Sequence, residues 1–136
     1  MKRLLVALSF LCALALLCAC APAPSDVPDG LWDGAVYTED ASVGTGSKTF
    51  TAEIVAGDRS VTLTVATDAS TLSEALSPLG LLQGAAGYYD TVNGMTASWD
   101  KDQSYWALYS DGVMTMYGAD DAPVNGGERY TFRYTR

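Results

Sequence analysis

The sequence has no histidine, and its three cysteines, Cys12, Cys18 and Cys20, all lie near the N-terminus of the 136 residues. Beyond Cys20 there is no imidazole to act as a base, no thiol nucleophile and no pair of cysteines for a disulfide. Basic residues are scarce as well, with eight Lys and Arg against sixteen Asp and Glu and a formal net charge of −8. An acidic chain repels nucleic acid. We therefore expect a protein that is not an enzyme, has no cofactor or metal centre and has no nucleic-acid partner.

Two chemical alternatives depend on carboxylates alone. Pairs drawn from Asp90, Asp100 and Asp102 could serve glycoside hydrolysis. The run Asp100-Lys101-Asp102 begins like a calcium-binding loop, but Tyr105 stands where that loop needs glycine. Acidic residues beside turns are usually solvated, so we expect neither activity.

The N-terminus carries the features of an export signal. Lys2 and Arg3 precede an apolar run at 4–17, which is shorter than the roughly 20 residues of a membrane-spanning helix. The following Leu17-Cys18-Ala19-Cys20 has the pattern of a bacterial lipobox, in which Cys20 becomes the lipidated N-terminus. We expect a signal peptide at 1–19 and a mature protein anchored by lipid at the extracellular face of a bacterial cell membrane.

The mature chain divides into a lead-in and one domain. Residues 20–47 hold the lipidated cysteine, a proline-rich tether (APAPSDVPDG) and a lead-in with Trp32 and Tyr37. All sixteen acidic residues and six of the eight basic ones follow Cys20, so the mature charge would be −10. This acidity favours solubility outside the cell.

Residues 48–136 alternate in the manner of a sheet. KTFTAEIV and SVTLTVAT place apolar residues at every second position around Gly57-Asp58, which predicts a hairpin with one buried face. TLSEALSPLG instead has the spacing of a short helix, with Thr71 and Glu74 as a capping box and Gly80 at its end. Further strand-like runs flank Asn93-Gly94 and Asp111-Gly112, and RYTFRYT closes the chain. This order predicts an α+β, β-grasp (ubiquitin-like) sheet of 5–7 mostly antiparallel strands with one short helix.

The run SYWALYSDGVMTMYG at 104–118 is rich in aromatic residues and methionine. A two-residue turn at Asp111-Gly112 would place Trp106 opposite Tyr117 and Ala107 opposite Met116. One side of this hairpin would then face the core through Trp106, Leu108 and Val113, and the other would carry Tyr105, Tyr109, Met114 and Met116 without any charge. Such a face suits a large, flat, part-apolar ligand. Alternatively, residues 31–47 cover it.

The same residues resemble a known family. TLSEAL, GYYDTVNGMTASWD and SYWALYSDG…YGADDAPVNGGERYTF are similar, in this order, to the C-terminal domain of transcobalamin and intrinsic factor. That domain also occurs alone in bacterial surface lipoproteins, where it was filed as a domain of unknown function. The resemblance covers about residues 48–136. Its marks are Asn93-Gly94 after Val92, the pair Tyr105-Trp106, and Gly118-x-Asp120.

The resemblance implies a ligand-binding β-grasp domain. In transcobalamin it closes over one face of cobalamin opposite a helical domain, so cobalamin or another corrinoid is the candidate ligand. The expected ligand-binding residues are Tyr88, Tyr89, Tyr105, Tyr109, Met114 and Met116. The missing half of such a site would have to come from a partner protein, a dimer or a transporter subunit. The expected function is non-catalytic ligand capture for uptake; the alternative is an adhesion or protein-interaction module that uses the same face.

Overall fold

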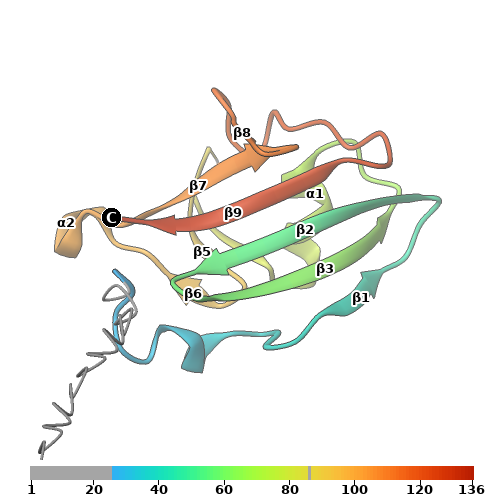
Figure 1. Ribbon diagram of the computed structural model, residues 1–136. Helices are drawn as coiled ribbons and strands as arrows, with labels where there is room; N and C mark the ends of the chain where they lie inside the picture. The colour runs from blue at the N-terminus through green and yellow to red at the C-terminus, as the bar shows by residue number, and fades with distance from the viewer. Residues whose placement is uncertain (1–25, 86) are drawn as a thin grey trace, which may run out of the picture.

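A computed structural model describes residues 26–85 and 87–136, and within these residues the strands form two sheets (Figure 1). The large sheet has six strands in the order β1-β3-β2-β9-β7-β8. Its strands are β1 (Ala41–Gly44), β2 (Lys48–Ala56), β3 (Arg59–Thr67), β7 (Tyr105–Ser110), β8 (Val113–Met114) and β9 (Arg129–Thr135). The small sheet consists of β4 (Leu82–Ala85), β5 (Tyr88–Val92) and β6 (Met95–Thr96). The expected signal peptide, Cys20 and the first part of the tether lie outside the described residues.

The predicted hairpin at the start of the domain is confirmed. β2 and β3 pair antiparallel over their whole length, from Lys48 opposite Thr67 to Ala56 opposite Arg59. The apolar residues of the alternating pattern are buried on one face, among them Phe50, Ile54 and Leu63. Period-two alternation predicts this arrangement because successive side chains of a strand point to opposite faces.

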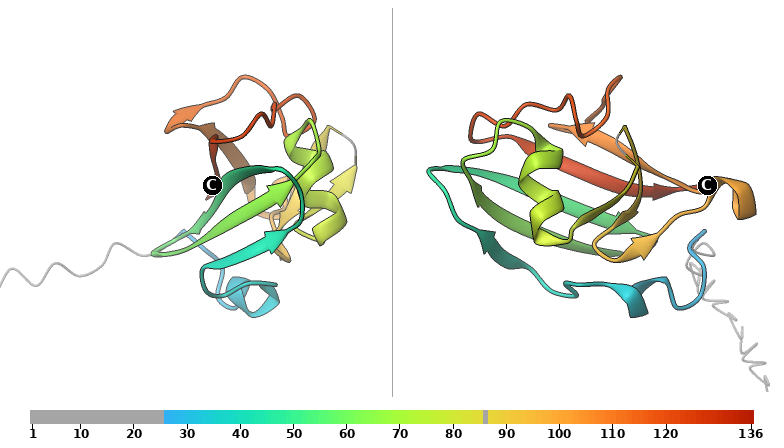
Figure 2. Two further views of the ribbon diagram at one scale, coloured as in Figure 1. Left: turned by 90° about the vertical axis from the view of Figure 1, so that its right-hand side faces the viewer. Right: turned by 180° about the vertical axis from the view of Figure 1, so that it is seen from behind.

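The predicted helix is also confirmed, and it is short. α1 (Leu72–Leu76) begins after Thr71, whose hydroxyl accepts a hydrogen bond from the Glu74 N–H at 3.3 Å. The Glu74 carboxylate accepts from the N–H of Ser70 rather than that of Thr71, so the capping box is shifted by one residue. Pro78 lies in a 3-10 turn, η2 (Ser77–Leu79), which ends at Gly80 with φ of 72°. Figure 2 shows α1 packed across one face of the large sheet.

The strand order places β9 at the centre of the large sheet. β9 pairs parallel with β2 and antiparallel with β7. Its buried face carries Tyr130, Phe132 and Tyr134, which contribute to the apolar core. The opposite face carries Arg129 and Arg133. The small sheet packs on the same face as α1, which leaves the other face of the large sheet open (Figure 2).

The second sheet and a second helix are not predicted by the sequence pattern. The Asn93-Gly94 turn does join two strands, β5 and β6, but they belong to the small sheet. The run MTASW is a strand only at Met95–Thr96, because Ser98 starts a new helix, α2 (Trp99–Asp102). The Ser98 hydroxyl accepts a hydrogen bond from the Lys101 N–H at 3.3 Å. A helix of one turn is too short to show a 3.6-residue period.

The lead-in packs along the edge of the large sheet that lies opposite to β8. It forms a 3-10 turn, η1 (Leu31–Gly34), and the short strand β1, which pairs parallel with β3. The Trp32 indole donates a hydrogen bond to the Ala56 carbonyl at 3.2 Å. In Figure 1 the lead-in (blue) and β8 (orange) lie at opposite edges of the sheet. The alternative that residues 31–47 cover the aromatic hairpin is therefore wrong.

No helix among the described residues is long and apolar enough to cross a membrane.

Candidate functional site

The predicted hairpin turn between β7 and β8 is confirmed, but the hairpin is shorter than expected. Asp111 and Gly112 have φ of 49° and 83°. Tyr109 lies opposite Met114, and the Thr115 N–H donates to the Leu108 carbonyl at 2.9 Å. The expected pairing of Trp106 with Tyr117 and of Ala107 with Met116 is wrong, since β8 ends at Met114. The Thr115 hydroxyl instead donates to the Tyr117 carbonyl at 2.7 Å, which stabilises a turn in the chain.

The segment after this turn exposes a row of apolar side chains. We call residues 113–117 the apolar loop. Val113 is 71% exposed, so its expected place in the core is wrong, and Met116 is 99% exposed. Met114 and Tyr117 are exposed as well. Single exposed apolar residues are ordinary on protein surfaces, but a contiguous group of them marks an interaction site.

A groove lies beside the apolar loop, between β5 and the edge of β7. β8 pairs only with the last two residues of β7, so no described strand covers the edge at 105–107. The groove has a volume of about 130 Å³. Its lining is mostly aromatic and aliphatic: Gly87, Tyr88, Tyr89, Tyr105, Trp106, Leu108, Gly118, Ala119 and Phe132. Three of the predicted ligand-binding residues, Tyr88, Tyr89 and Tyr105, are thus brought together.

Tyr89 forms a fixed wall of this groove. Its hydroxyl donates to Asp120 at 2.6 Å, and the Gly87 N–H donates to the other oxygen of the same carboxylate at 2.8 Å. The hydrogen bond to Asp120 raises the pKa of Tyr89, and the same bond lowers the pKa of Asp120. Asp120 therefore connects the β4–β5 loop to the segment that follows the apolar loop. Within the resemblance mark Gly118-x-Asp120, the aspartate therefore has a structural role.

The other predicted residues lie outside the groove lining. Tyr109 and Met114 form a cross-strand pair in the β7–β8 hairpin. The Arg133 guanidinium lies 5.8 Å from the Tyr109 ring centroid, a cation–π contact on the open face of the sheet. Met116 belongs to the apolar loop. The six predicted residues thus divide between a groove and an adjoining hairpin.

A second hollow lies on the other side of Tyr88, and we call it the aromatic corner. It has a volume of about 350 Å³ and is lined by Tyr88, Asp90, Ala97, Ser98, Trp99 and Asp100. Trp99 is 56% exposed, and its ring meets Tyr105 edge-on with centroids 6.2 Å apart. Sequence reasoning missed Trp99 because it assigned this residue to a strand. The available signal was Ser98, a favoured N-cap residue, followed by Asp100 in the first turn of a helix that starts at Trp99.

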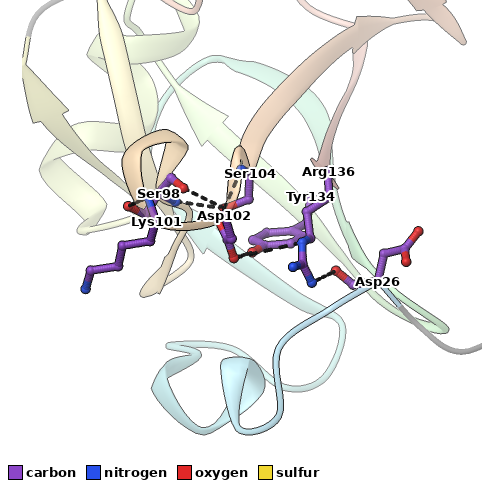
Figure 3. A network of polar contacts seen from close by, with 7 residues as sticks. All are labelled: Asp26, Ser98, Lys101, Asp102, Ser104, Tyr134 and Arg136. Atoms are coloured by element: carbon purple, nitrogen blue, oxygen red, sulfur yellow. Dashed lines mark hydrogen bonds and ion pairs between the residues drawn. The ribbon is translucent and has the colours of Figure 1, made fainter.

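A polar network holds the helix that carries Trp99 (Figure 3). Ser104 is buried, accepts the Ser98 N–H at 2.8 Å and donates its hydroxyl to Asp102 at 2.5 Å. Asp102 also accepts from the Tyr134 hydroxyl at 3.5 Å and lies 4.0 Å from the Arg136 guanidinium. The Ser104 hydroxyl lowers the pKa of Asp102 more than any other group does. These contacts fix the helix against the end of β9.

The described residues contain no group of three or more His, Cys, Asp or Glu side chains that could hold a metal ion. The run Asp100-Lys101-Asp102 forms α2 rather than an open loop.

The fold and these surfaces define a class: a small, mostly β domain of two open sheets with a few short helices, which presents uncharged rings beside an uncovered strand edge. Residues 69–136 match the family described as "Domain of unknown function (DUF4430)", and the chain belongs to this family. No curated protein matches the sequence.

Among the solved structures with a similar fold are two that bear on the function. A Ruminococcus gnavus protein described as a "putative metal binding protein" is 27% identical, with a TM-score of 0.61 over 66% of this chain and 98% of that one. Haptocorrin in complex with Cbi is 18% identical, with a TM-score of 0.52 over 65% of this chain. The match spans only 25% of the haptocorrin chain, and at this identity it shows the fold alone.

Proposed function

We propose that this protein is a non-catalytic binding lipoprotein, anchored by lipid on Cys20 at the extracellular face of a bacterial membrane, that captures a part-apolar small molecule for uptake. The apolar loop carries the proposal. Val113 and Met116 are exposed beside a groove of aromatic rings, and no residue of the loop is charged. Rings stack on flat ligands and thioethers adapt to their outline.

A corrinoid is the ligand that we propose. The support is the haptocorrin structure, which contains Cbi, together with the strand order of the large sheet. The strand order is that of a β-grasp domain, as the sequence resemblance to transcobalamin implies. It consists of the hairpin β2–β3, the helix α1 across one face, and the last strand, β9, parallel to the first strand of the hairpin, β2. Because the sequence has no histidine, the chain would hold a corrinoid by stacking and hydrogen bonds rather than by an imidazole on cobalt.

The size of the groove requires a second component. Pocket ligands usually bury 70–90% of their surface in cavities of about 300–1,000 Å³, whereas this groove holds about 130 Å³. A corrinoid would therefore rest on the apolar loop and extend beyond the groove. We propose that a transporter subunit or another surface protein covers its far side.

The test is a titration of the full chain, purified in detergent, with cobalamin and with cobinamide. Tryptophan fluorescence and the corrin absorption spectrum report binding. Val113→Gln and Met116→Gln should each weaken a saturable response, because they place an amide where the ligand meets apolar side chains. Val36→Gln is the matched control, since Val36 is an exposed valine of the lead-in. Absence of a saturable response, or equal loss in the Val36 variant, would contradict the corrinoid proposal.

The second candidate is a protein-interaction or adhesion module, and one observation favours it. The edge of β7 at 105–107 is uncovered by any described strand, and an extended segment of a partner can add a strand to such an edge. In that case the apolar loop would contact a protein rather than a corrinoid. Binding to a surface protein in the absence of any corrinoid would support this function.

The proposed binding rests on apolar contacts and needs no metal ion; the described residues offer no group of three metal-ligating side chains.

A further inference from the structure

We propose that the aromatic corner binds an organic ammonium ion, with a quaternary amine of the choline type as the ligand class. Two rings and two carboxylates line it, Tyr88, Trp99, Asp90 and Asp100. Tyr105 lies outside the lining and meets the Trp99 ring edge-on. Aromatic faces attract a cation through their quadrupole, and desolvated quaternary ammonium groups are bound by cages of such rings. This site goes beyond the corrinoid proposal and differs from it in ligand charge.

The rings are exposed, and a polar network outside the hollow supports one of them. Trp99 and Tyr88 are each about half exposed in the same hollow of about 350 Å³. Tyr105 meets Trp99 edge-on at an interplanar angle of 62°, so the two rings form a corner rather than a flat stack. Ser104 and Asp102 hold the helix that presents Trp99, as Figure 3 shows. The corner is therefore preorganised rather than assembled by the ligand.

The charge of the hollow is negative. Asp90 and Asp100 line it, and no basic residue does. Neither carboxylate forms an ion pair within the described part of the chain. Asp90 accepts one hydrogen bond, from the Thr91 hydroxyl at 3.1 Å, which leaves its charge uncompensated. A carboxylate beside aromatic faces favours a cation over a neutral molecule of equal shape.

The chemistry of the hollow favours an ammonium ion over a metal ion. Ca²⁺ needs six to eight oxygen ligands, and Mg²⁺ needs an octahedral set. The described residues offer two carboxylates here and no group of three. Methylated ammonium groups instead need ring faces and diffuse negative charge, both of which are present.

The test compares two ligands of the same shape. The full chain in detergent is titrated with choline and, separately, with 3,3-dimethylbutan-1-ol, its uncharged carbon analogue, while tryptophan fluorescence is followed. Choline should give a saturable change, and the alcohol should bind at least about fivefold more weakly, because only choline gains cation–π and Coulomb attraction. Equal binding of the two ligands, or no saturable change with choline, would overturn the proposal.

Three variants locate the site. Asp90→Asn keeps the acceptor for Thr91 and removes the charge, and it should weaken choline binding by roughly three- to fivefold, as should Asp100→Asn. Trp99→Leu should abolish choline binding as measured by calorimetry, a readout that does not depend on the Trp99 fluorophore. Asp58→Asn, at an exposed acidic turn between β2 and β3, should leave choline binding unchanged. Unchanged affinity in both Asp90→Asn and Asp100→Asn would overturn the proposal.

Two further readouts keep this inference separate from misfolding and from the corrinoid proposal. Far-UV circular dichroism and the urea midpoint should be unchanged in the aspartate variants, since both keep the shape of the side chain. Cobinamide binding, if present, should survive in these variants while choline binding falls. Loss of both ligands together would show that the hollow belongs to a single site and would overturn the separate cation site.

Discussion

Asn93 connects the lead-in to the rest of the domain, and its replacement tests how the lead-in is held. Its side chain is fully buried; the Tyr37 N–H donates to the Asn93 side-chain oxygen at 2.9 Å, and the Asn93 amide donates to the Tyr37 carbonyl at 2.8 Å. Asn93 also has φ of 52°, in the left-handed region. Asparagine tolerates this conformation better than alanine does.

The expected cost of Asn93→Ala follows from these two features. Two lost hydrogen bonds at about 1 kcal/mol each, plus about 1 kcal/mol for a left-handed alanine, give about 3 kcal/mol of unfolding free energy. Asn93→Gly loses the same hydrogen bonds without the backbone strain, so we expect about 2 kcal/mol. The difference between the two variants isolates the contribution of the backbone conformation.

Urea unfolding followed by far-UV circular dichroism measures both losses. Hydrogen exchange of the Tyr37 amide provides a local readout and should accelerate in both variants. If Asn93→Ala costs less than about 1 kcal/mol, or if the Tyr37 amide stays protected, the lead-in is held by other contacts and the reasoning is refuted.

Two further predictions concern polar groups near the site. Ser104→Ala removes a buried hydroxyl that accepts a hydrogen bond from the Ser98 N–H and donates one to Asp102. We expect the free energy of unfolding in urea to fall by about 1–3 kcal/mol, with a change in Trp99 fluorescence. An unchanged urea midpoint would contradict the role of the network. The pKa of Asp120 lies below its ordinary value of 3.8, chiefly because the Tyr89 hydroxyl donates a hydrogen bond to its carboxylate. The ionised carboxylate therefore stabilises the folded protein above pH 3.8, and this contribution is lost as the pH falls through the pKa of the folded state. Tyr89→Phe should flatten the loss of stability below about pH 4, and an acid-unfolding curve of unchanged slope would contradict this assignment.

The first hairpin of the large sheet and two further turns were predictable from local rules. Alternation in residues 48–67 predicts the buried face of β2 and β3. Asn-Gly and Asp-Gly predict the turn of the small sheet at Asn93 and the turn between β7 and β8 at Asp111, and both residues have positive φ. The division into two sheets was not predictable from these rules. A strand pattern shows which face is buried, but it does not show which strand is the neighbour. The pairing of β1 with β3 and of β9 with β2 depends on contacts between residues far apart in sequence.

The candidate site was predictable in its residue types rather than in its geometry. The uncharged rings and thioethers of the hairpin indicated an exposed surface, and Met114 and Met116 are indeed exposed. Simple alternation along the hairpin places Val113 in the core, whereas its side chain is exposed. The Thr115–Tyr117 hydrogen bond, which stabilises the turn after β8, has no periodic signature. The helical position of Trp99 has no periodic signature either, because a four-residue helix is too short to repeat a 3.6-residue period.

The start of the described chain determines which end of the domain would face the membrane. The Arg136 guanidinium donates to the Asp26 carbonyl at 3.4 Å, beside Asp102 and α2 (Figure 3). If Cys20 carries the lipid, the six Cα–Cα steps to Asp26 reach at most about 20 Å. The aromatic corner would then lie near the membrane surface, whereas the turn at the far end of β7 would lie further out (Figure 1).

This arrangement gives a prediction that distinguishes the two ends of β7. The sample is the processed, lipidated protein on vesicles, from which Cys12 and Cys18 have been removed with the signal peptide. Fluorophores are attached at Asp100→Cys or at Asp111→Cys. A quencher on the lipid headgroup should then quench the two positions unequally. Quenching should be stronger at position 100, because headgroup quenching falls steeply with distance. Equal quenching, or stronger quenching at position 111, would mean that the domain rests on the membrane through its hairpin, where the apolar loop would be occupied by lipid rather than by a soluble ligand.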